Sequence, residues 1–152
     1  MIDLDYILKQ YPGAKVFDDG FEVGEAKYGG GAGLVLPIIQ KKKWGGEAWL
    51  IYTDKYALKI LFVSQGNRLS LQKHKQKVET WSVLKGHPEI TLGDKKFTAE
   101  PGQIIHLPAG TIHRLAATDD DIEVLEVSTA ELWDLERIED DYGREQYSGK
   151  IL

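Results

Sequence analysis

Four side chains in the middle of the chain could together bind a divalent metal ion. They are Gln72, His74, Glu79 and His113. Two imidazoles and two oxygen donors, with no sulfur, suit zinc, manganese, cobalt, iron or nickel, and the ligand types alone do not select among these metals. A single histidine beside an apolar strand is more often structural. The prediction of a metal site therefore depends on the combination and spacing of all four residues.

The spacing of these residues fits strands that are joined by short turns. Side chains alternate between the two faces of a strand, so the run RLSLQKH predicts that Arg68, Gln72 and His74 point the same way. Glu79 comes five residues after His74, which leaves room for a short turn, and it begins the strand-like run ETWSVLKG. His113 follows PGQIIHLPAGTI, which predicts a turn, a short apolar strand and a second turn.

The overall composition is that of an ordinary globular protein. The chain has 152 residues, of which 42% are hydrophobic and 28% charged, enough for one domain with a substantial core. It has no cysteine, which excludes disulfides and thiolate ligands. A net charge of −5 argues against general binding of nucleic acid, which needs an excess of lysine and arginine. No transmembrane or signal pattern is present, so we expect a cytoplasmic protein that does not bind membranes.

Short β-type runs follow one another, separated by turn residues, and this pattern is typical of an all-β sandwich or barrel. The runs are AWLIYTD, YALKILFV, ETWSVLK, EITL, KKFTAE and DIEVLEVST. We therefore predict an all-β fold that positions the four candidate ligands.

The first 43 residues have a different pattern. Residues 2–11 predict a short helix, which Pro12 and the glycine after it would end. Residues 33–40 predict an edge strand or arm, because Pro37 cannot donate a hydrogen bond within a central ladder. An open edge of this kind needs a partner strand, so we expect a homodimer. We divide the chain into an N-terminal helix and arm, residues 1–43, and a main domain, residues 44–152, which together we expect to form one globular unit.

Two stretches resemble the motifs of the cupin superfamily. GNRLSLQKHKQKVETWSVLKG is similar to the first cupin motif, with Gln72 where many cupins carry a histidine, and PGQIIHLPAGTIH is similar to the second. The runs RLSLQ-x-H, PAGTIHR and EDDYGR resemble, more narrowly, the cupin domain of type II phosphomannose isomerases, which often follows a mannose-1-phosphate guanylyltransferase domain. This resemblance implies a cupin double-stranded β-helix, a jelly-roll barrel. It also implies one divalent metal ion in the barrel, which we expect to be zinc, with manganese, cobalt, nickel or iron as alternatives.

The same resemblance implies a metal-dependent aldose–ketose isomerase for sugar phosphates, with mannose-6-phosphate to fructose-6-phosphate as the nearest reaction. The partner would be a small sugar or sugar phosphate. The candidate catalytic residues are cations that could hold a phosphate or polarise a carbonyl: Lys59, Arg68 and Arg137. The candidate substrate-binding residues are Trp81, which could stack on a sugar ring, His106 and Arg144.

The sequence also departs from the isomerase pattern. Lys77 and Thr80 stand where the family commonly carries arginine and histidine, and a lysine lacks the two-pronged hydrogen-bonding geometry of arginine. The first forty residues do not match the family. The alternative function is therefore a non-catalytic or regulatory cupin that binds a sugar or other small ligand. An iron-dependent dioxygenase fits less well, because such sites usually carry more imidazole.

Overall fold

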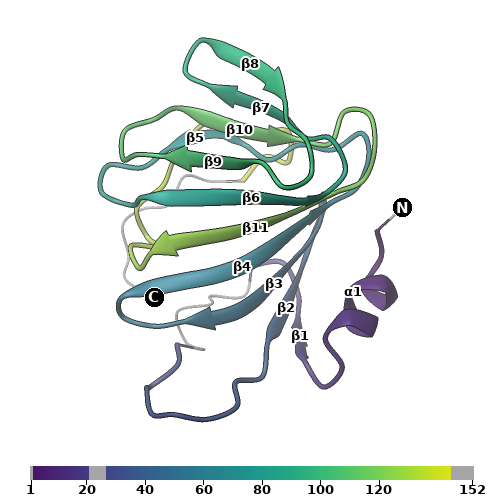
Figure 1. The fold of residues 1–152 in the computed structure, drawn as a ribbon, viewed down its shortest axis with the longest axis vertical. Coiled ribbons are helices and arrows are strands. Elements are labelled where there is room, and N and C mark those ends of the chain that lie inside the picture. Colours follow the sequence, from purple (N-terminus) through teal and green to yellow (C-terminus); the bar gives the residue numbers. More distant parts are fainter. Residues whose placement is uncertain (1, 21–26, 145–152) are drawn as a thin grey trace.

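In the computed structural model, the described residues form two β-sheets that face each other and one short helix (Figure 1). The structure describes residues 2–20 and 27–144. The larger sheet has seven strands in the order β1 (Lys15–Phe17), β2 (Ile38–Lys42), β3 (Gly45–Tyr52), β4 (Tyr56–Val63), β11 (Ile122–Thr129), β6 (Glu79–Lys85) and β9 (Ile104–Leu107). The smaller sheet has five, in the order β12 (Glu136–Glu139), β5 (Leu71–Lys73), β10 (His113–Ala116), β7 (Glu89–Leu92) and β8 (Lys95–Thr98). The predicted all-β fold is confirmed.

Alternation along the strands separates the inner face of the larger sheet from its outer face. In β4, Leu61 and Val63 belong to the core between the two sheets, together with Leu115 of the smaller sheet. Ile60 precedes Leu61, and Phe62 lies between Leu61 and Val63. Both belong to a second cluster on the outer face. The strand is therefore buried on both faces, which explains why its sequence is an almost continuous apolar run.

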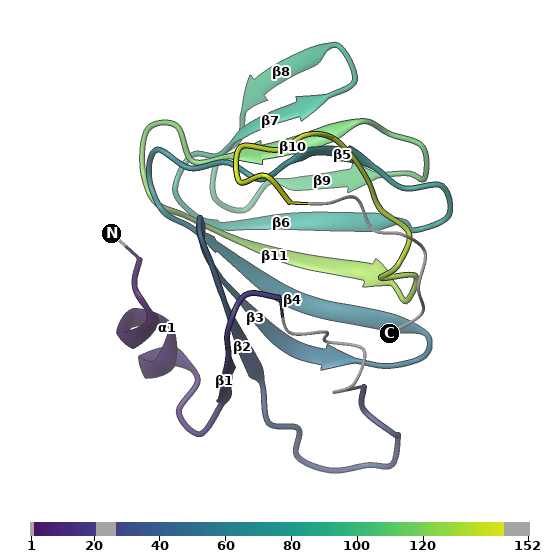
Figure 2. The ribbon, with the colours of Figure 1, turned by 180° about the vertical axis from the view of Figure 1, so that it is seen from behind.

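The helix α1 (Leu4–Gln10) covers part of the outer face of the larger sheet (Figure 2). The side chain of Asp3 accepts a hydrogen bond from the backbone N–H of Tyr6 and so caps the N-terminus. Ile7 is the buried residue of the helix, and it packs in the outer cluster with Phe62. The predicted helix before Pro12 is confirmed, and its role is to cover a sheet face.

Of the edge strand or arm predicted at residues 33–40, the edge strand is wrong, whereas residues 33–37 lie outside any strand, with Leu34 and Leu36 exposed. Strand β2 begins at Ile38, pairs antiparallel with β3 and pairs parallel with β1, so it has a neighbour on each side. Pro37 lies just before the strand, where its carbonyl accepts a hydrogen bond from Lys15 and its missing N–H is not needed. The argument for a homodimer from an unpaired β2 edge loses its basis. The sheet is also continuous across the division that we predicted at residue 43.

In the described residues, no helix is long and apolar enough to cross a membrane.

The C-terminal part of the chain adds one strand that the sequence pattern does not indicate. Strand β12 pairs antiparallel with β5, and Arg137 lies opposite Gln72 in this pairing. This strand brings the tail of the chain to the candidate metal ligands.

Candidate metal centre and substrate cavity

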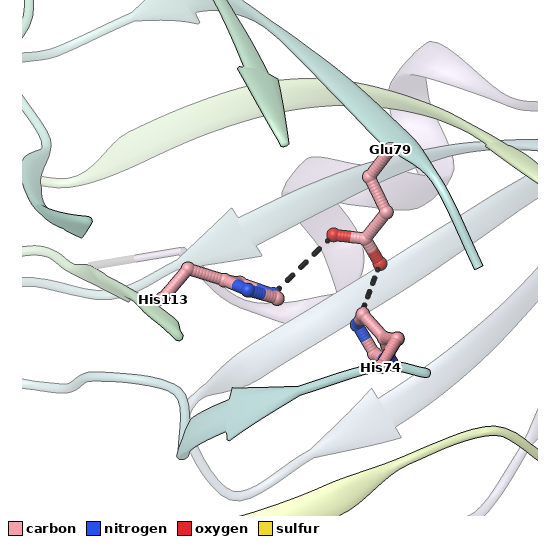
Figure 3. Close-up of side chains that lie close together, drawn as sticks. All are labelled: His74, Glu79 and His113. Atoms are coloured by element: carbon pink, nitrogen blue, oxygen red, sulfur yellow. Dashed lines mark ion pairs between the residues drawn. The ribbon is translucent and has the colours of Figure 1, made fainter. Parts of the chain in front are cut away.

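Three of the four predicted ligands converge between the two sheets (Figure 3). His74 directly follows β5, while Glu79 begins β6 and His113 begins β10. Their ligand atoms all lie within 4.8 Å of one another. Nε2 of His74 is 3.2 Å from one oxygen of Glu79, and Nε2 of His113 is 3.5 Å from the other. The three side chains are buried.

Hydrogen bonds on the far side of each imidazole fix its tautomer. Nδ1 of His74 contacts the backbone carbonyl of Asp134, and Nδ1 of His113 lies 2.9 Å from the carbonyl of Thr111. A carbonyl only accepts, so each Nδ1 carries the hydrogen and each Nε2 directs a lone pair at Glu79. An imidazole lone pair and a carboxylate oxygen repel each other unless a cation lies between them. Oε2 of Glu79 and Nε2 of His74 have no hydrogen-bond donor of their own, so the donor set fits a divalent cation.

The charge state of these groups is also the one that a metal ligand requires. Burial would raise the pKa of Glu79, but the opposing effects, of which the charge of Lys77 is the largest, hold the pKa well below its usual range. Nζ of Lys77 is 2.9 Å from Oε1 of Glu79. Burial lowers the pKa of His113, which favours the neutral ring. The sequence assigned no role to Lys77, although it is buried at the site.

Gln72 lies opposite His113 in the pairing of β5 with β10 and can act as the fourth ligand. Its Nε2 is 3.3 Å from Nε2 of His113, and its Oε1 accepts a hydrogen bond of 2.7 Å from the hydroxyl of Ser70. Rotating the amide by half a turn would direct the oxygen at the site, and the hydroxyl of Ser70 could then accept from the amide nitrogen. The side chain therefore offers an oxygen ligand without any change in the backbone.

Asp134 organises the loop between two of the ligands, and the sequence analysis missed it. Its carboxylate accepts hydrogen bonds from the backbone N–H groups of Lys75, Gln76 and Lys77, and its carbonyl holds the ring of His74. Burial would raise the pKa of this carboxyl, but the three N–H groups lower it. No local pattern reveals this role, because Asp134 is almost sixty residues away from its partners.

Replacing Asp134 with alanine is expected to weaken zinc binding about 10- to 100-fold, which is the usual effect of removing a group that holds a metal ligand in place. A competition titration against a zinc-binding dye measures the change. Asp121→Ala is the matched control, because Asp121 likewise accepts a backbone N–H, that of Gln65, away from the site. Equal zinc affinity in the two variants would show that the carboxylate of Asp134, which holds the loop after His74, is not needed for zinc binding.

A cavity of about 600 Å³ adjoins the metal ligands and is cationic. Gln72, His74 and Glu79 form part of its wall. Among its lining residues are six lysines and arginines and four acids: Lys42, Lys43, Lys59, Lys77, Arg137 and Arg144, with Asp19, Glu47, Glu79 and Glu126. The protein carries a net charge of −5, so this excess of positive charge is local. Such a cavity favours a small anionic ligand.

A cross-strand row of side chains forms one wall of this cavity. Trp49, Lys59, Glu126 and Trp81 lie opposite one another on β3, β4, β11 and β6. Nζ of Lys59 is 3.1 Å from Glu47 and 3.5 Å from Glu126, and it lies 4.4 Å from the ring centre of Trp49. Burial would lower the pKa of Lys59, but the two glutamates raise it, so the side chain carries a positive charge before any ligand binds.

The structure places the other predicted site residues in two groups. Lys59, Trp81, Arg137 and Arg144 line the cavity, whereas Arg68 and His106 do not. Burial and the charge of Arg144 lower the pKa of Arg137. Arg144 is also held by Asp140 through two hydrogen bonds of 2.8 and 3.1 Å.

Arg68 and His106 have structural reasons for lying elsewhere. The regular strand β5 begins only at Leu71, so the alternation of faces does not extend back to Arg68, which forms a surface ion pair with Asp141 at 2.7 Å. In β9, Ile105 is directed into the core. His106 is therefore exposed on the opposite face, where it lies 3.0 Å from the hydroxyl of Thr80.

Solved structures with the same fold include proteins of low sequence identity. CapF, solved with the inhibitor 3-isopropenyl-tropolone, has a TM-score of 0.60 and 17% identity, covering 68% of this chain and 34% of that one. A double-stranded β-helix protein from Klebsiella pneumoniae has a TM-score of 0.56 and 16% identity, covering 80% of this chain and 98% of that one. These likenesses confirm the predicted cupin double-stranded β-helix.

Sequence comparison identifies the family. Alginate biosynthesis protein AlgA of Pseudomonas aeruginosa is 34% identical over 107 residues, which is 68% of this chain and 22% of AlgA. A mannose-1-phosphate guanylyltransferase of Sinorhizobium fredii is 38% identical over 74 residues, which is 49% of this chain and 14% of that protein. The chain thus spans less than a quarter of the length of these relatives. Residues 39–141 match the family described as "Mannose-6-phosphate isomerase C-terminal", and the chain belongs to that family.

Proposed function

We propose that the protein is a metal-dependent aldose–ketose isomerase that acts on a phosphorylated sugar. The nearest reaction is the interconversion of mannose-6-phosphate and fructose-6-phosphate. The observation that carries the proposal is the buried His–Glu–His donor set beside a cationic cavity. Membership of the mannose-6-phosphate isomerase C-terminal family supports it, as does a relative named for its action on mannose-1-phosphate.

The metal ion would be held by His74, Glu79 and His113, with the amide oxygen of Gln72 as a further ligand. We expect zinc, with manganese, cobalt, nickel and iron as the alternatives that the same ligands accept. A divalent ion bound there would act as a Lewis acid that polarises the oxygens of the sugar. The buried position of all three ligands keeps bulk water away from this end of the cavity.

Other residues of the cavity can bind the two parts of the substrate, the phosphate and the sugar. Arg137 and Arg144 present planar guanidinium groups, which pair with phosphate oxygens through two parallel hydrogen bonds. Trp81 lies in the cavity wall beside the metal ligands, where the edge of its buried ring can meet the carbon atoms of the sugar. The ammonium of Lys59 can donate hydrogen bonds to oxygens on which negative charge develops during isomerisation.

An assay with the metal-loaded protein tests this proposal. Fructose-6-phosphate formed from mannose-6-phosphate is followed by NMR, with unphosphorylated mannose as a parallel substrate. We expect turnover of the phosphate alone. Arg137→Met should raise the KM about 10- to 100-fold, which is the usual contribution of a charge-assisted hydrogen bond to binding. Arg68→Met, which removes a cation outside the cavity, should leave the KM unchanged. If a protein that holds one metal ion converts no hexose or pentose phosphate, the isomerase proposal fails and the protein binds a small ligand without catalysis.

A further inference from the structure

We propose that Glu126 is the catalytic base that moves the proton between two carbons of the sugar, and that Glu47 positions Lys59 beside it. This assignment rests on the proposed isomerase function and adds the group that the reaction needs. An aldose–ketose isomerisation requires a base that can reach a C–H bond of the bound sugar. In the described part of the chain, the acids that line the cavity are Asp19, Glu47, Glu79 and Glu126.

Three of these acids are unsuited to the role for separate reasons. Glu79 belongs to the metal ligands. Asp19 has a side chain that is 36% exposed and is paired with Lys42. Glu47 has both oxygens occupied, one by Lys59 at 3.1 Å and the other by the indole N–H of Trp49 at 3.0 Å. Each oxygen of Glu47 is therefore engaged by a donor at 3.0 to 3.1 Å, which fixes this carboxylate as the partner of Lys59 and Trp49.

One carboxylate oxygen of Glu126 accepts a hydrogen bond, whereas the other makes only a longer contact. Its Oε1 accepts a hydrogen bond of 3.0 Å from the indole N–H of Trp81. Its Oε2 is 3.5 Å from Nζ of Lys59, which is longer than the 3.1 Å contact that Lys59 makes with Glu47. This arrangement orients the carboxylate and leaves Oε2 able to contact a ligand in the cavity. At 5% exposure, Glu126 is shielded from bulk water, which favours proton transfer to and from carbon.

The position of Glu126 also places the base beside the metal ligands. The residue lies opposite Trp81 on the neighbouring strand. The ring of Trp81 packs edge-on against the ring of His113, with 5.6 Å between the ring centres. A sugar that lies along Trp81 therefore meets the metal ligands at one end and Glu126 with Lys59 at the other. The two sets of groups act on the same small region of a substrate.

The proposed steps balance without any further reactant. In the direction from aldose to ketose, Glu126 takes the proton from C2, the C–H electrons form a double bond between C1 and C2, and the carbonyl electrons move to O1. The ammonium of Lys59 donates a proton to O1 and recovers one from the O2 hydroxyl. The electrons of O2 then form the new carbonyl, and C1 receives the proton back from Glu126. Both side chains return to their starting states, and nothing is oxidised or reduced overall.

The test compares three variants of the metal-loaded protein with the wild type. Glu126→Gln keeps the shape of the side chain and removes its basicity, Glu126→Asp keeps a carboxylate, and Glu47→Gln is the matched change in the neighbouring acid. Glu126→Gln should lower kcat about 100- to 10,000-fold, which is the usual contribution of a general base to the rate, and should change KM less than about threefold. Glu126→Asp should recover part of that loss. Glu47→Gln should lower kcat less than about tenfold, as expected for a residue that acts through another.

A second readout separates catalysis from folding. In heavy water, exchange of the C1 or C2 hydrogen with solvent, measured by NMR, should be lost in Glu126→Gln and retained in Glu126→Asp and Glu47→Gln. Glu126→Gln leaves Lys59 paired with Glu47, so the buried charges balance and the variant should unfold at a temperature close to that of the wild type. Near-normal kcat in Glu126→Gln, or an equal loss in Glu47→Gln, would overturn the assignment and leave the isomerase function standing. A wild type that turns over no sugar phosphate would overturn both.

Discussion

Replacing His74 and His113 together with alanine is expected to abolish metal binding and, with it, isomerase turnover. Each imidazole directs its Nε2 at Glu79, and Oε2 of Glu79 has no hydrogen-bond donor of its own. Removing both rings leaves one carboxylate and one amide, so zinc affinity should fall far more than the 10- to 100-fold that follows the loss of a supporting group. Calorimetric titration with zinc, together with metal analysis after dialysis, measures the change.

The chain offers a matched control for this experiment. It has four histidines, and the other two, His87 and His106, are exposed. His87 pairs with Asp120 at 2.7 Å, and His106 contacts Thr80 on the outer face. The double change His87→Ala, His106→Ala should leave zinc binding and turnover intact. If the first double variant still binds one equivalent of zinc as tightly as the wild type, the metal centre lies elsewhere.

Replacing Lys59 with methionine is expected to destabilise the fold by about 3–5 kcal/mol at pH 8, because it leaves two buried carboxylates without their cation. Methionine keeps the volume of the side chain, so the effect reports the charge. Glu47 and Glu126 are 7% and 5% exposed, so water cannot replace the ammonium. Urea unfolding of wild type and variant at pH 8 and pH 5 measures the free energy of unfolding.

The pH dependence of this effect has a definite sign. In the wild type, burial would raise the pKa of Glu47, but Lys59 and Lys42 outweigh it and lower the pKa to about 2, below the usual 4.5. That carboxylate therefore stabilises the fold above about pH 4.5 and loses its contribution as the pH falls toward 2. In the variant, burial remains while the main charge that lowers the pKa of Glu47 is lost, so that pKa should rise and stability should fall as the pH rises.

The stability difference between variant and wild type should accordingly be larger at pH 8 than at pH 5. Lys96→Met is the control, since Lys96 also pairs with a glutamate, Glu89 at 3.7 Å, but its side chain is 62% exposed. That change should have little effect on the free energy of unfolding, because an exposed ion pair is screened by water. An equally small effect of Lys59→Met at both pH values would mean that the buried carboxylates do not depend on Lys59.

The sequence predicted those parts of the site that depend on local spacing. Three of the four candidate ligands converge, because His74 lies at the end of a short strand and Glu79 and His113 each begin one. The same alternation rule misplaced Arg68, since the chain before Leu71 is not a regular strand. Local rules are therefore reliable only within the bounds of an element, and those bounds are the least certain part of a sequence-based prediction.

The residues that the sequence missed are those whose partners are distant in the chain. Asp134 holds the loop that follows His74, from about sixty residues away. Glu47 and Glu126 meet at Lys59 only because β3, β4 and β11 are neighbours in the sheet. Glu126 shares one face of β11 with Ile122 and Val124, which belong to the inner core, and this spacing of two residues was a usable signal. Such a residue faces inward, and it needs a buried partner of opposite charge.

The most direct test of the central claim is a titration of metal-free protein with zinc, in which isomerase activity on mannose-6-phosphate is followed at each addition. Activity should be absent in the chelated protein and rise in proportion to added zinc. It should reach its plateau at one equivalent per chain, because residues 2–20 and 27–144 provide one donor set for one ion. Full turnover of mannose-6-phosphate by the metal-free protein would contradict the account.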